Sequence, residues 1–214
     1  MSMLTSSATE PALVALHDAV KCYGRRRVLA LPRFELRRGD CVLVTGANGS
    51  GKSTLLRVLA GVARLSEGRI ARSGTYETLR VCYLPQSGGL HTHLTLADNL
   101  RLWAVLMGVR EPRDLARQWY LRGFDLLPYL DTPCRELSGG FQRLAALACA
   151  LATGPDGLFV DEPLAGIDEG HARVLVDGLA AAQSGLHFLV VTSHSAADLP
   201  SASRHLKLVD GAPA

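Results

Sequence analysis

The feature that most constrains this chain is the segment at residues 46–54, which reads GANGSGKST. It fits the pattern G-x-x-x-x-G-K-[ST] at every fixed position. An apolar run at residues 41–45 precedes it, and a helix is predicted over residues 52–60. Glycines in such a strand–loop–helix turn let backbone N–H groups converge on phosphate oxygens, and the start of the helix adds partial positive charge. The sequence therefore predicts a phosphate-binding loop.

Each residue of this loop is a candidate nucleotide contact. We expect the Lys52 ammonium group to reach the β- and γ-phosphates, the Ser53 hydroxyl to ligate Mg²⁺, and Thr54 to lie beside the α-phosphate. A glycine-rich structural turn is the alternative that the complete pattern disfavours. The predicted contacts are Gly46, Ala47, Asn48, Gly49, Ser50, Gly51, Lys52, Ser53 and Thr54.

An acidic motif follows the loop by about a hundred residues, where Asp161 and Glu162 come directly after the apolar run 158–160. A carboxylate at the end of a buried strand can hold Mg²⁺ through water, which we expect of Asp161. Glu162 could polarise the water that attacks the γ-phosphate, as a general base. A surface carboxylate is the alternative for Glu162. Because a phosphate-binding loop precedes them in the sequence, however, Asp161 and Glu162 together indicate a catalytic site.

A third motif, Leu137-Ser138-Gly139-Gly140, precedes a predicted helix, with Ser138 standing 23 residues before Asp161. Taken alone, Ser-Gly-Gly is a turn or a helix N-cap. A serine hydroxyl and glycine amides at a helix start also form an anion site, by the same physics as the first loop. The chain then carries two phosphate-binding surfaces, which need not face the same nucleotide.

Strands and helices alternate along the chain, which predicts an α/β fold with a mostly parallel sheet covered on both faces. Residues 87–137 differ, because only helical patterns occur there. We predict strands at residues 12–20, 28–31, 33–36, 41–45, 69–71, 79–84, 158–160, 186–192 and 205–209. We predict helices at residues 52–60, 96–107, 114–122, 126–130, 140–153 and 169–183.

Composition excludes several classes of protein. Of the 214 residues, 48% are hydrophobic and 20% are charged, which is ordinary for a globular protein. The longest apolar stretches, such as 144–152, have about half the length that a membrane span needs. A net charge of +3 without a run of five like charges gives no indication of a nucleic-acid partner, and we expect none. Residues 1–11 are expected to be a flexible leader and not a signal peptide.

The cysteines and the paired histidines indicate no metal or disulfide site. The five cysteines are odd in number and form no CxxC, so free, buried thiols in a reducing compartment are expected. His91 and His93 alternate without a further ligand at suitable spacing, which disfavours metal binding there.

The three motifs, in this order, make the chain resemble the nucleotide-binding subunit of an ABC transporter over about residues 12–210. Four further positions match that family. Tyr23 matches the aromatic that stacks on adenine, and Gln86 matches the glutamine that contacts Mg²⁺ and the attacking water. Asp168 matches the aspartate of the D-loop, and His194 matches the switch histidine at the γ-phosphate. Without this context, each would be an ordinary core, turn or loop residue.

The resemblance implies an ATPase that uses ATP and Mg²⁺. The implied catalytic residues are Glu162, His194 and Gln86, and the implied Mg²⁺ ligands are Ser53, Gln86 and Asp161. The implied nucleotide contacts are Tyr23, residues 46–54, Ser138, Gly139, Gly140 and Asp168. The implied organisation is a RecA-like core, residues 12–86 and 138–214, with an N-terminal antiparallel β part and a helical subdomain at residues 87–137.

The resemblance also implies partners. Two such subunits, identical or related, would pack head to tail around two ATP molecules. An integral-membrane subunit would dock on residues 87–137, which places the chain at the cytoplasmic face of the cell membrane. Aromatic residues gather in that segment, although they could equally form its own core. The pattern resembles compact exporters, including the ATPase associated with haem export and cytochrome c maturation.

The sequence departs from the family at four positions: Phe141 stands where the signature motif LSGGQ has glutamine, Leu144 and Cys149 replace common basic residues, and Ser195 replaces a frequent aspartate. None of these changes removes a catalytic group, so we expect an active ATPase. A DNA-repair or translation ATPase, a P-loop kinase and a regulatory subunit without turnover remain as alternatives. The short chain, the Ser-Gly-Gly motif and the presence of Glu162 with His194 argue against them in turn.

Overall fold

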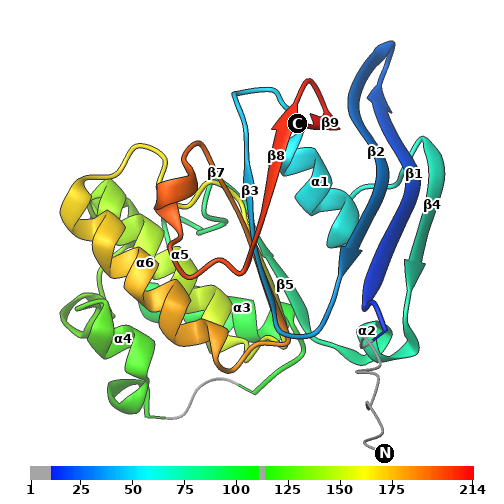
Figure 1. The fold of residues 1–214 in the computed structure, drawn as a ribbon. Helices are drawn as coiled ribbons and strands as arrows, with labels where there is room; N and C mark the ends of the chain where they lie inside the picture. The colour runs from blue at the N-terminus through cyan, green and yellow to red at the C-terminus, as the bar shows by residue number, and fades with distance from the viewer. Residues whose placement is uncertain (1–10, 111–113) are drawn as a thin grey trace, which may run out of the picture.

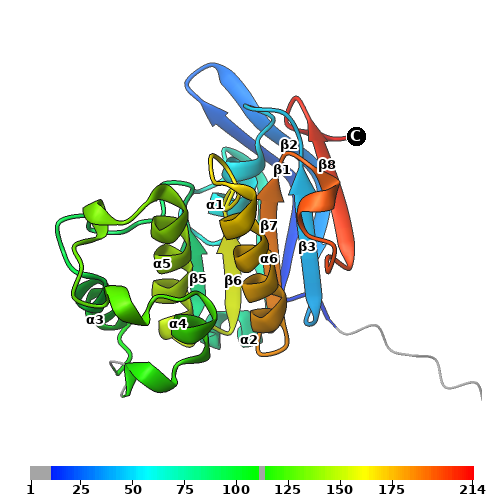
Figure 2. The same cartoon turned by 90° about the vertical axis from the view of Figure 1, so that its left-hand side faces the viewer.

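A six-stranded sheet forms the centre of the computed structural model, which describes residues 11–110 and 114–214 (Figures 1 and 2). Its strand order is β5-β6-β7-β3-β8-β9, and every neighbouring pair is parallel except β8 with β9. The α/β prediction is therefore confirmed. The strands are β3 (Asp40–Thr45), β5 (Val81–Leu84), β6 (Gly157–Val160), β7 (Phe188–Ser193), β8 (Arg204–Val209) and β9 (Ala212–Pro213).

A separate three-stranded antiparallel sheet, in the order β2-β1-β4, stands beside the central one. Its strands are β1 (Val14–Tyr23), β2 (Arg26–Leu36) and β4 (Glu67–Arg72). The two strands predicted at 28–31 and 33–36 are one strand that runs through Pro32. Proline is tolerated there because β2 is an edge strand of this sheet and needs no full ladder of N–H donors.

Helices cover both faces of the central sheet because its strands are apolar on both sides. Helix α1 (Lys52–Leu59) lies between the two sheets, whereas α5 (Gly139–Ala152) and α6 (Glu169–Gln183) cover the opposite face (Figure 1). Strand β3 shows the division, since Cys41 and Leu43 pack in the core under α5 while Val42 and Val44 pack in the core under α1. Two apolar cores, one on each face, therefore hold the central sheet in place. The phosphate-binding loop and the acidic motif both begin at the carboxyl ends of its strands, the loop after β3 and the acidic motif after β6.

The segment between β5 and α5 contains only helical elements within its described residues, apart from an isolated bridge between Thr95 and Pro133. The helix predicted at 114–122 is wrong: Gln118 has an extended backbone (ψ 119°), which separates a 3₁₀ turn from a short α4. The elements are α3 (Leu96–Leu106), η1 (Leu115–Arg117), α4 (Trp119–Gly123), η2 (Leu127–Tyr129) and η3 (Cys134–Glu136). The boundaries 87 and 137 of a separate subdomain stay a prediction.

Two smaller differences concern the chain before β5 and the chain end. The helix α2 (Gly74–Thr78) was not predicted; Ser73 caps it by accepting a hydrogen bond from the backbone N–H of Tyr76 at 3.1 Å. The strand predicted at 79–84 is accordingly shorter. A 3₁₀ turn, η4 (Ala196–Asp198), follows β7.

The aromatic residues of the helical segment mostly form its own core. Tyr120 and Phe124 are buried, and Trp103 packs partly buried against the same cluster, whereas Trp119 is 43% exposed. All five cysteines are free, and all but Cys22 are buried, as expected. The proposed leader at residues 1–10 lies outside the described residues, and none of the described helices is long and apolar enough to cross a bilayer.

Candidate active site

The predicted phosphate-binding loop connects the end of β3 to the start of α1. Gly51 has a φ of 96°, and a Cβ at this position would lie 2.6 Å from the carbonyl oxygen of Val28, so only glycine fits. The Ser50 Oγ atom is buried and makes no hydrogen bond within the described structure. Residues 49–54, Val28 and Glu162 line a cleft of about 110 Å³. An unsatisfied hydroxyl beside this cleft fits a site that binds a polar ligand.

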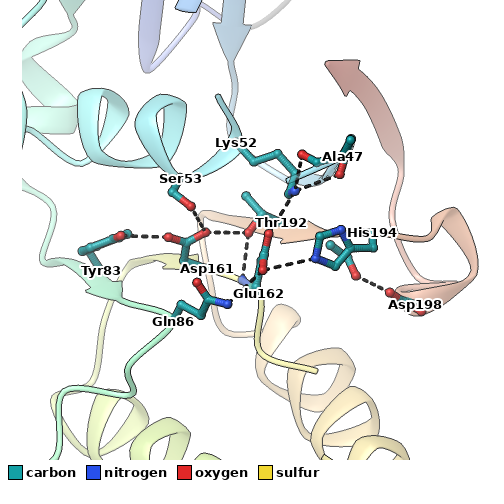
Figure 3. Close-up of polar contacts among 12 residues, drawn as sticks. Ala47, Lys52, Ser53, Tyr83, Gln86, Asp161, Glu162, Thr192, His194 and Asp198 are labelled. Atoms are coloured by element: carbon teal, nitrogen blue, oxygen red, sulfur yellow. Dashed lines mark hydrogen bonds and ion pairs between the residues drawn. The ribbon is translucent and has the colours of Figure 1, made fainter. Parts of the chain in front are cut away.

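Lys52 is one of the residues that line this cleft. Its side chain is only 3% exposed, and its Nζ donates hydrogen bonds to the carbonyl oxygens of Gly46 at 2.8 Å and Ala47 at 3.1 Å (Figure 3). Nζ also forms an ion pair with Glu162 Oε1 at 2.9 Å. A buried ammonium group needs such partners, because burial of an unpaired charge is costly. Lys52 thus links the start of the phosphate-binding loop to Glu162 of the acidic motif.

The carboxylate of Asp161 accepts hydrogen bonds from three hydroxyl groups, one each on α1, β7 and β5. Its Oδ1 accepts hydrogen bonds from Ser53 Oγ at 2.9 Å and Thr192 Oγ1 at 2.8 Å, and its Oδ2 accepts one from the hydroxyl of Tyr83 at 3.1 Å (Figure 3). Carboxylate and hydroxyl oxygens are hard donors that suit Mg²⁺. Asp161 and Ser53 therefore have the chemistry and the mutual distance of a magnesium site.

Glu162 lies at the centre of the cluster. Its carboxylate is 8% exposed, pairs with Lys52, accepts a hydrogen bond from Gln86 Nε2 at 3.0 Å, and lies 3.3 Å from Nε2 of His194. Its φ of 45° is in the left-handed region, which non-glycine residues rarely adopt and which clusters at functional sites. The backbone N–H of Glu162 donates to Thr192 Oγ1 at 2.8 Å, which helps to hold this backbone. The structure thus brings together the three predicted catalytic side chains.

Tyr23 and the second anion motif lie elsewhere on the chain. Tyr23 ends β1, is 48% exposed, and has the Lys21 Nζ atom 4.9 Å from its ring centre. Ser138 caps α5 by accepting a hydrogen bond from the N–H of Phe141 at 3.3 Å. Gly139 beside it is exposed. No hydrogen bond among the described residues joins this motif to residues 46–54.

Asp168 caps α6 and is equally separate from the first cluster. It accepts a hydrogen bond from the backbone N–H of His171 at 3.1 Å and one from His171 Nδ1 at 2.6 Å. The backbone N–H of His171 contributes most to lowering the pKa of Asp168, and its side chain adds to this. Asp168 is thus a fixed anion on the molecular surface, with 63% of its side chain exposed.

Sequence reasoning missed Tyr83 and Thr192. Both occupy strands that neighbour β6, and the carboxyl ends of parallel strands meet at one edge of the sheet, where ligands bind. Polar residues at the ends of β5 and β7 were therefore the available signal. Burial is the main cause that raises the pKa of Tyr83, and the negative charge of Asp161 adds to it. The phenol therefore stays protonated at neutral pH and can donate.

The family model described as "ABC transporter" matches residues 30–165 of the chain. A "Cytochrome c biogenesis ATP-binding export protein CcmA" of Zymomonas mobilis is 34% identical over 188 residues, which cover 88% of this chain and 81% of that protein. A "Nod factor export ATP-binding protein I" of Cupriavidus metallidurans is 28% identical, with 93% and 68% covered.

Solved structures agree in fold. The structure described as "Structure of ATP binding subunit of ABC transporter" superposes with a TM-score of 0.80 at 26% identity, covering 94% of this chain and 88% of that one. An ATP-binding cassette solved as a dimer in a post-hydrolysis state with ADP and Pi has a TM-score of 0.79 at 23% identity, with 94% and 96% covered. The second likeness shows the fold alone.

Proposed function

This chain belongs to the ABC transporter family as an ATP-binding and ATP-hydrolysing subunit, and from that premise we propose which residues carry the reaction and with which partners. The Glu162 carboxylate carries the proposal. It is buried, held by Lys52, Gln86 and His194, and lies beside the phosphate-binding loop. A carboxylate so placed can accept a proton from water that attacks a γ-phosphate.

In this proposal Lys52 and the loop amides bind the phosphates. The ion pair between Lys52 and Glu162 opens when ATP enters, because the ammonium group exchanges the carboxylate for phosphate oxygens. Glu162 is then free to hold the attacking water, while Gln86 and His194 orient it from two sides. Tyr23, exposed at the end of β1, stacks on adenine.

Ser53 and Asp161 are the residues that would hold Mg²⁺, with Gln86 as a further ligand. Their oxygen atoms lie within 2.9 Å of each other, which supports a shared ion. When bound, Mg²⁺ neutralises charge that develops on the phosphate oxygens. Tyr83 and Thr192 keep the Asp161 carboxylate in position through their hydroxyl groups.

The partners follow from the separation of the two anion motifs. Within the described structure, no hydrogen bond joins Ser138, Gly139, Gly140 or Asp168 to residues 46–54, which supports a role for them toward ATP bound to another subunit. We therefore propose a head-to-tail dimer with a second copy or a related ATPase. An integral-membrane subunit docks on residues 87–137, at the cytoplasmic face of the membrane. The likeness to the CcmA relatives supports export linked to cytochrome c biogenesis as its role.

Glu162→Gln tests this assignment. The substitution should keep ATP binding, slow hydrolysis by about 10²-fold or more, and trap an ATP-dependent dimer on a sizing column, because the amide cannot accept the proton. Glu77→Gln, at an exposed position on α2, is the matched control and should behave as the wild type. A wild-type chain without ATPase activity even beside its membrane partner would contradict the proposal.

A further inference from the structure

The residue that departs from the family signature, Phe141, does not point freely to solvent. It is partly buried, and its ring centre lies 4.9 Å from that of Tyr129 and 4.8 Å from that of His171. The contact with His171 is edge-on, with an interplanar angle of 76°. Such edge-to-face pairs are favourable beyond the apolar area that they bury. His171 belongs to α6, so the pair joins the first turn of α5 to the first turn of α6.

The same histidine ring covers the signature glycine. A Cβ built at Gly140 would lie 2.6 Å from Nδ1 and 2.8 Å from Cδ2 of His171, closer than real Cβ contacts come. Gly140 is buried, although Ser138 and Gly139 beside it are exposed. The absence of a side chain at Gly140 therefore lets the His171 ring lie against the backbone of the signature loop.

The same ring also holds the aspartate of the D-loop. Nδ1 of His171 donates a hydrogen bond to Asp168 Oδ2 at 2.6 Å, and the backbone N–H of His171 donates to Oδ1 at 3.1 Å. Two hydrogen bonds to one carboxylate fix both of its oxygens, and bonds to a charged acceptor are stronger than neutral ones. Helices α5 and α6 run side by side, which lets the His171 ring of α6 reach Gly140 and Phe141 of α5 (Figure 2).

We propose that His171 is a positioning residue that holds the signature loop and the D-loop in one fixed arrangement. Its ring packs on Gly140 and Phe141 while its Nδ1–H holds Asp168, so both surfaces are set before a second subunit arrives. This inference rests on the proposed function, in which those surfaces meet ATP on the other subunit. It also explains how phenylalanine serves at position 141, since its ring supports the histidine.

Two variants in the Glu162→Gln background test the linkage. His171→Ala removes the ring and the donor, whereas His171→Phe keeps a ring over Gly140 and removes the donor to Asp168. Both should raise the protein concentration for half-maximal Mg·ATP-dependent dimerisation by about tenfold, measured by analytical ultracentrifugation. The affinity of the single chain for Mg·ATP, measured by titration below the dimerising concentration, should not change because residues 46–54 are untouched.

A double-variant cycle tests the contact with Gly140. Gly140→Ala should weaken dimerisation more than His171→Ala does, because the methyl group displaces the ring and the loop together. Combining the two changes should recover the level of His171→Ala alone, since the clash is gone. His205→Phe, at an exposed position of β8, is the control and should leave dimerisation unchanged.

The outcomes separate this inference from the function on which it rests. If the Glu162→Gln parent forms no dimer with ATP, the proposed function fails. If the parent dimerises and His171→Phe dimerises equally well, or if Gly140→Ala is no better tolerated beside His171→Ala, the linkage through His171 is overturned. A variant that misfolds would lose single-chain ATP binding too, and His171→Phe, which retains an aromatic ring, then provides the second measurement.

Discussion

The two proposed phosphate-binding surfaces of this chain are built in opposite ways. Around residues 46–54 the charged groups are buried and pair with one another: the side chains of Lys52 and Glu162 are 3% and 8% exposed and lie 2.9 Å apart. At the signature and D-loop, Ser138 and Asp168 cap their own helices and face outward, with the Asp168 side chain 63% exposed. The first surface is therefore preorganised around the proposed catalytic group, whereas the second leaves its polar groups accessible from outside the chain.

This difference teaches which half of the reaction one chain can perform alone. A buried, internally paired cluster binds a ligand by exchanging partners that are already in place, so ordering costs little. An exposed cap gains only weakly from binding a phosphate in water, but gains more when a second subunit excludes solvent. Of these two surfaces, we therefore expect single-chain ATP binding to depend on the first only and turnover to depend on both.

Lys52→Ala should produce the largest effect on single-chain binding. Loss of the ammonium group removes charge-assisted hydrogen bonds to phosphate and leaves Glu162 without its cation, so the affinity for ATP should fall about 10- to 100-fold. Isothermal titration calorimetry on the monomer measures this change. Lys207→Ala, on the exposed face of β8, is the control. Unchanged affinity in Lys52→Ala would remove Lys52 from the binding site and erase the contrast between the surfaces.

Ser138→Ala tests the second surface, at the signature motif. It should leave single-chain ATP affinity unchanged and lower the rate of hydrolysis about tenfold at saturating ATP, because in the proposed dimer the lost hydroxyl contacts only the phosphate held by the other subunit. The variant also loses an N-cap, which costs about 1 kcal/mol of folding stability. Ser73→Ala loses the equivalent cap of α2 and is the matched control for stability. Equal hydrolysis by the two variants would show that Ser138 is only a cap.

Most of the side chains that the structure brings together beside residues 46–54 are ones that the sequence names as candidates, and the reason is physical. A phosphate cradle needs glycines, a lysine and a hydroxyl at fixed spacing in a short segment, so local sequence carries the geometry. Long-range contacts leave no such pattern. Thr192 and Tyr83 reach Asp161 only because sheet order places β7 and β5 on either side of β6.

The residues assigned to the second surface come from the sequence, whereas the packing that supports them does not. The Ser-Gly-Gly motif and Asp168 were read from spacing and resemblance, whereas the His171 ring over Gly140 arises from packing between two helices. The break between η1 and α4 was also not predicted from the sequence. The apolar spacing of a helix continues on both sides of Gln118, whereas the backbone of this residue is extended.

Tyr83→Phe should produce the smallest effect and tests how far preorganisation extends beyond the residues that touch the ligand. The phenol is held by Arg57, whose Nε donates to its oxygen at 3.3 Å, and it donates in turn to Asp161 Oδ2. Burial raises the pKa of Tyr83 above its ordinary value, so the proton stays on the oxygen through neutral pH and the donor is constant there. Without the hydroxyl, Asp161 loses one of its two orienting contacts from neighbouring strands. The Mg²⁺ concentration for half-maximal activity should rise about two- to tenfold.

The measurement is the Mg²⁺ dependence of both nucleotide binding and hydrolysis, with ATP affinity in EDTA as the internal reference. That reference should not change, because the loop that holds the phosphates is intact. Tyr76→Phe is the matched control: Tyr76 is buried, and its hydroxyl donates to the carbonyl oxygen of Leu59 at 2.8 Å, away from Asp161. It should cost about 1 kcal/mol of stability without moving the Mg²⁺ dependence. If Tyr83→Phe and Tyr76→Phe shift the Mg²⁺ dependence alike, the phenol positions nothing, and the preorganised surface ends at Ser53, Thr192 and Glu162.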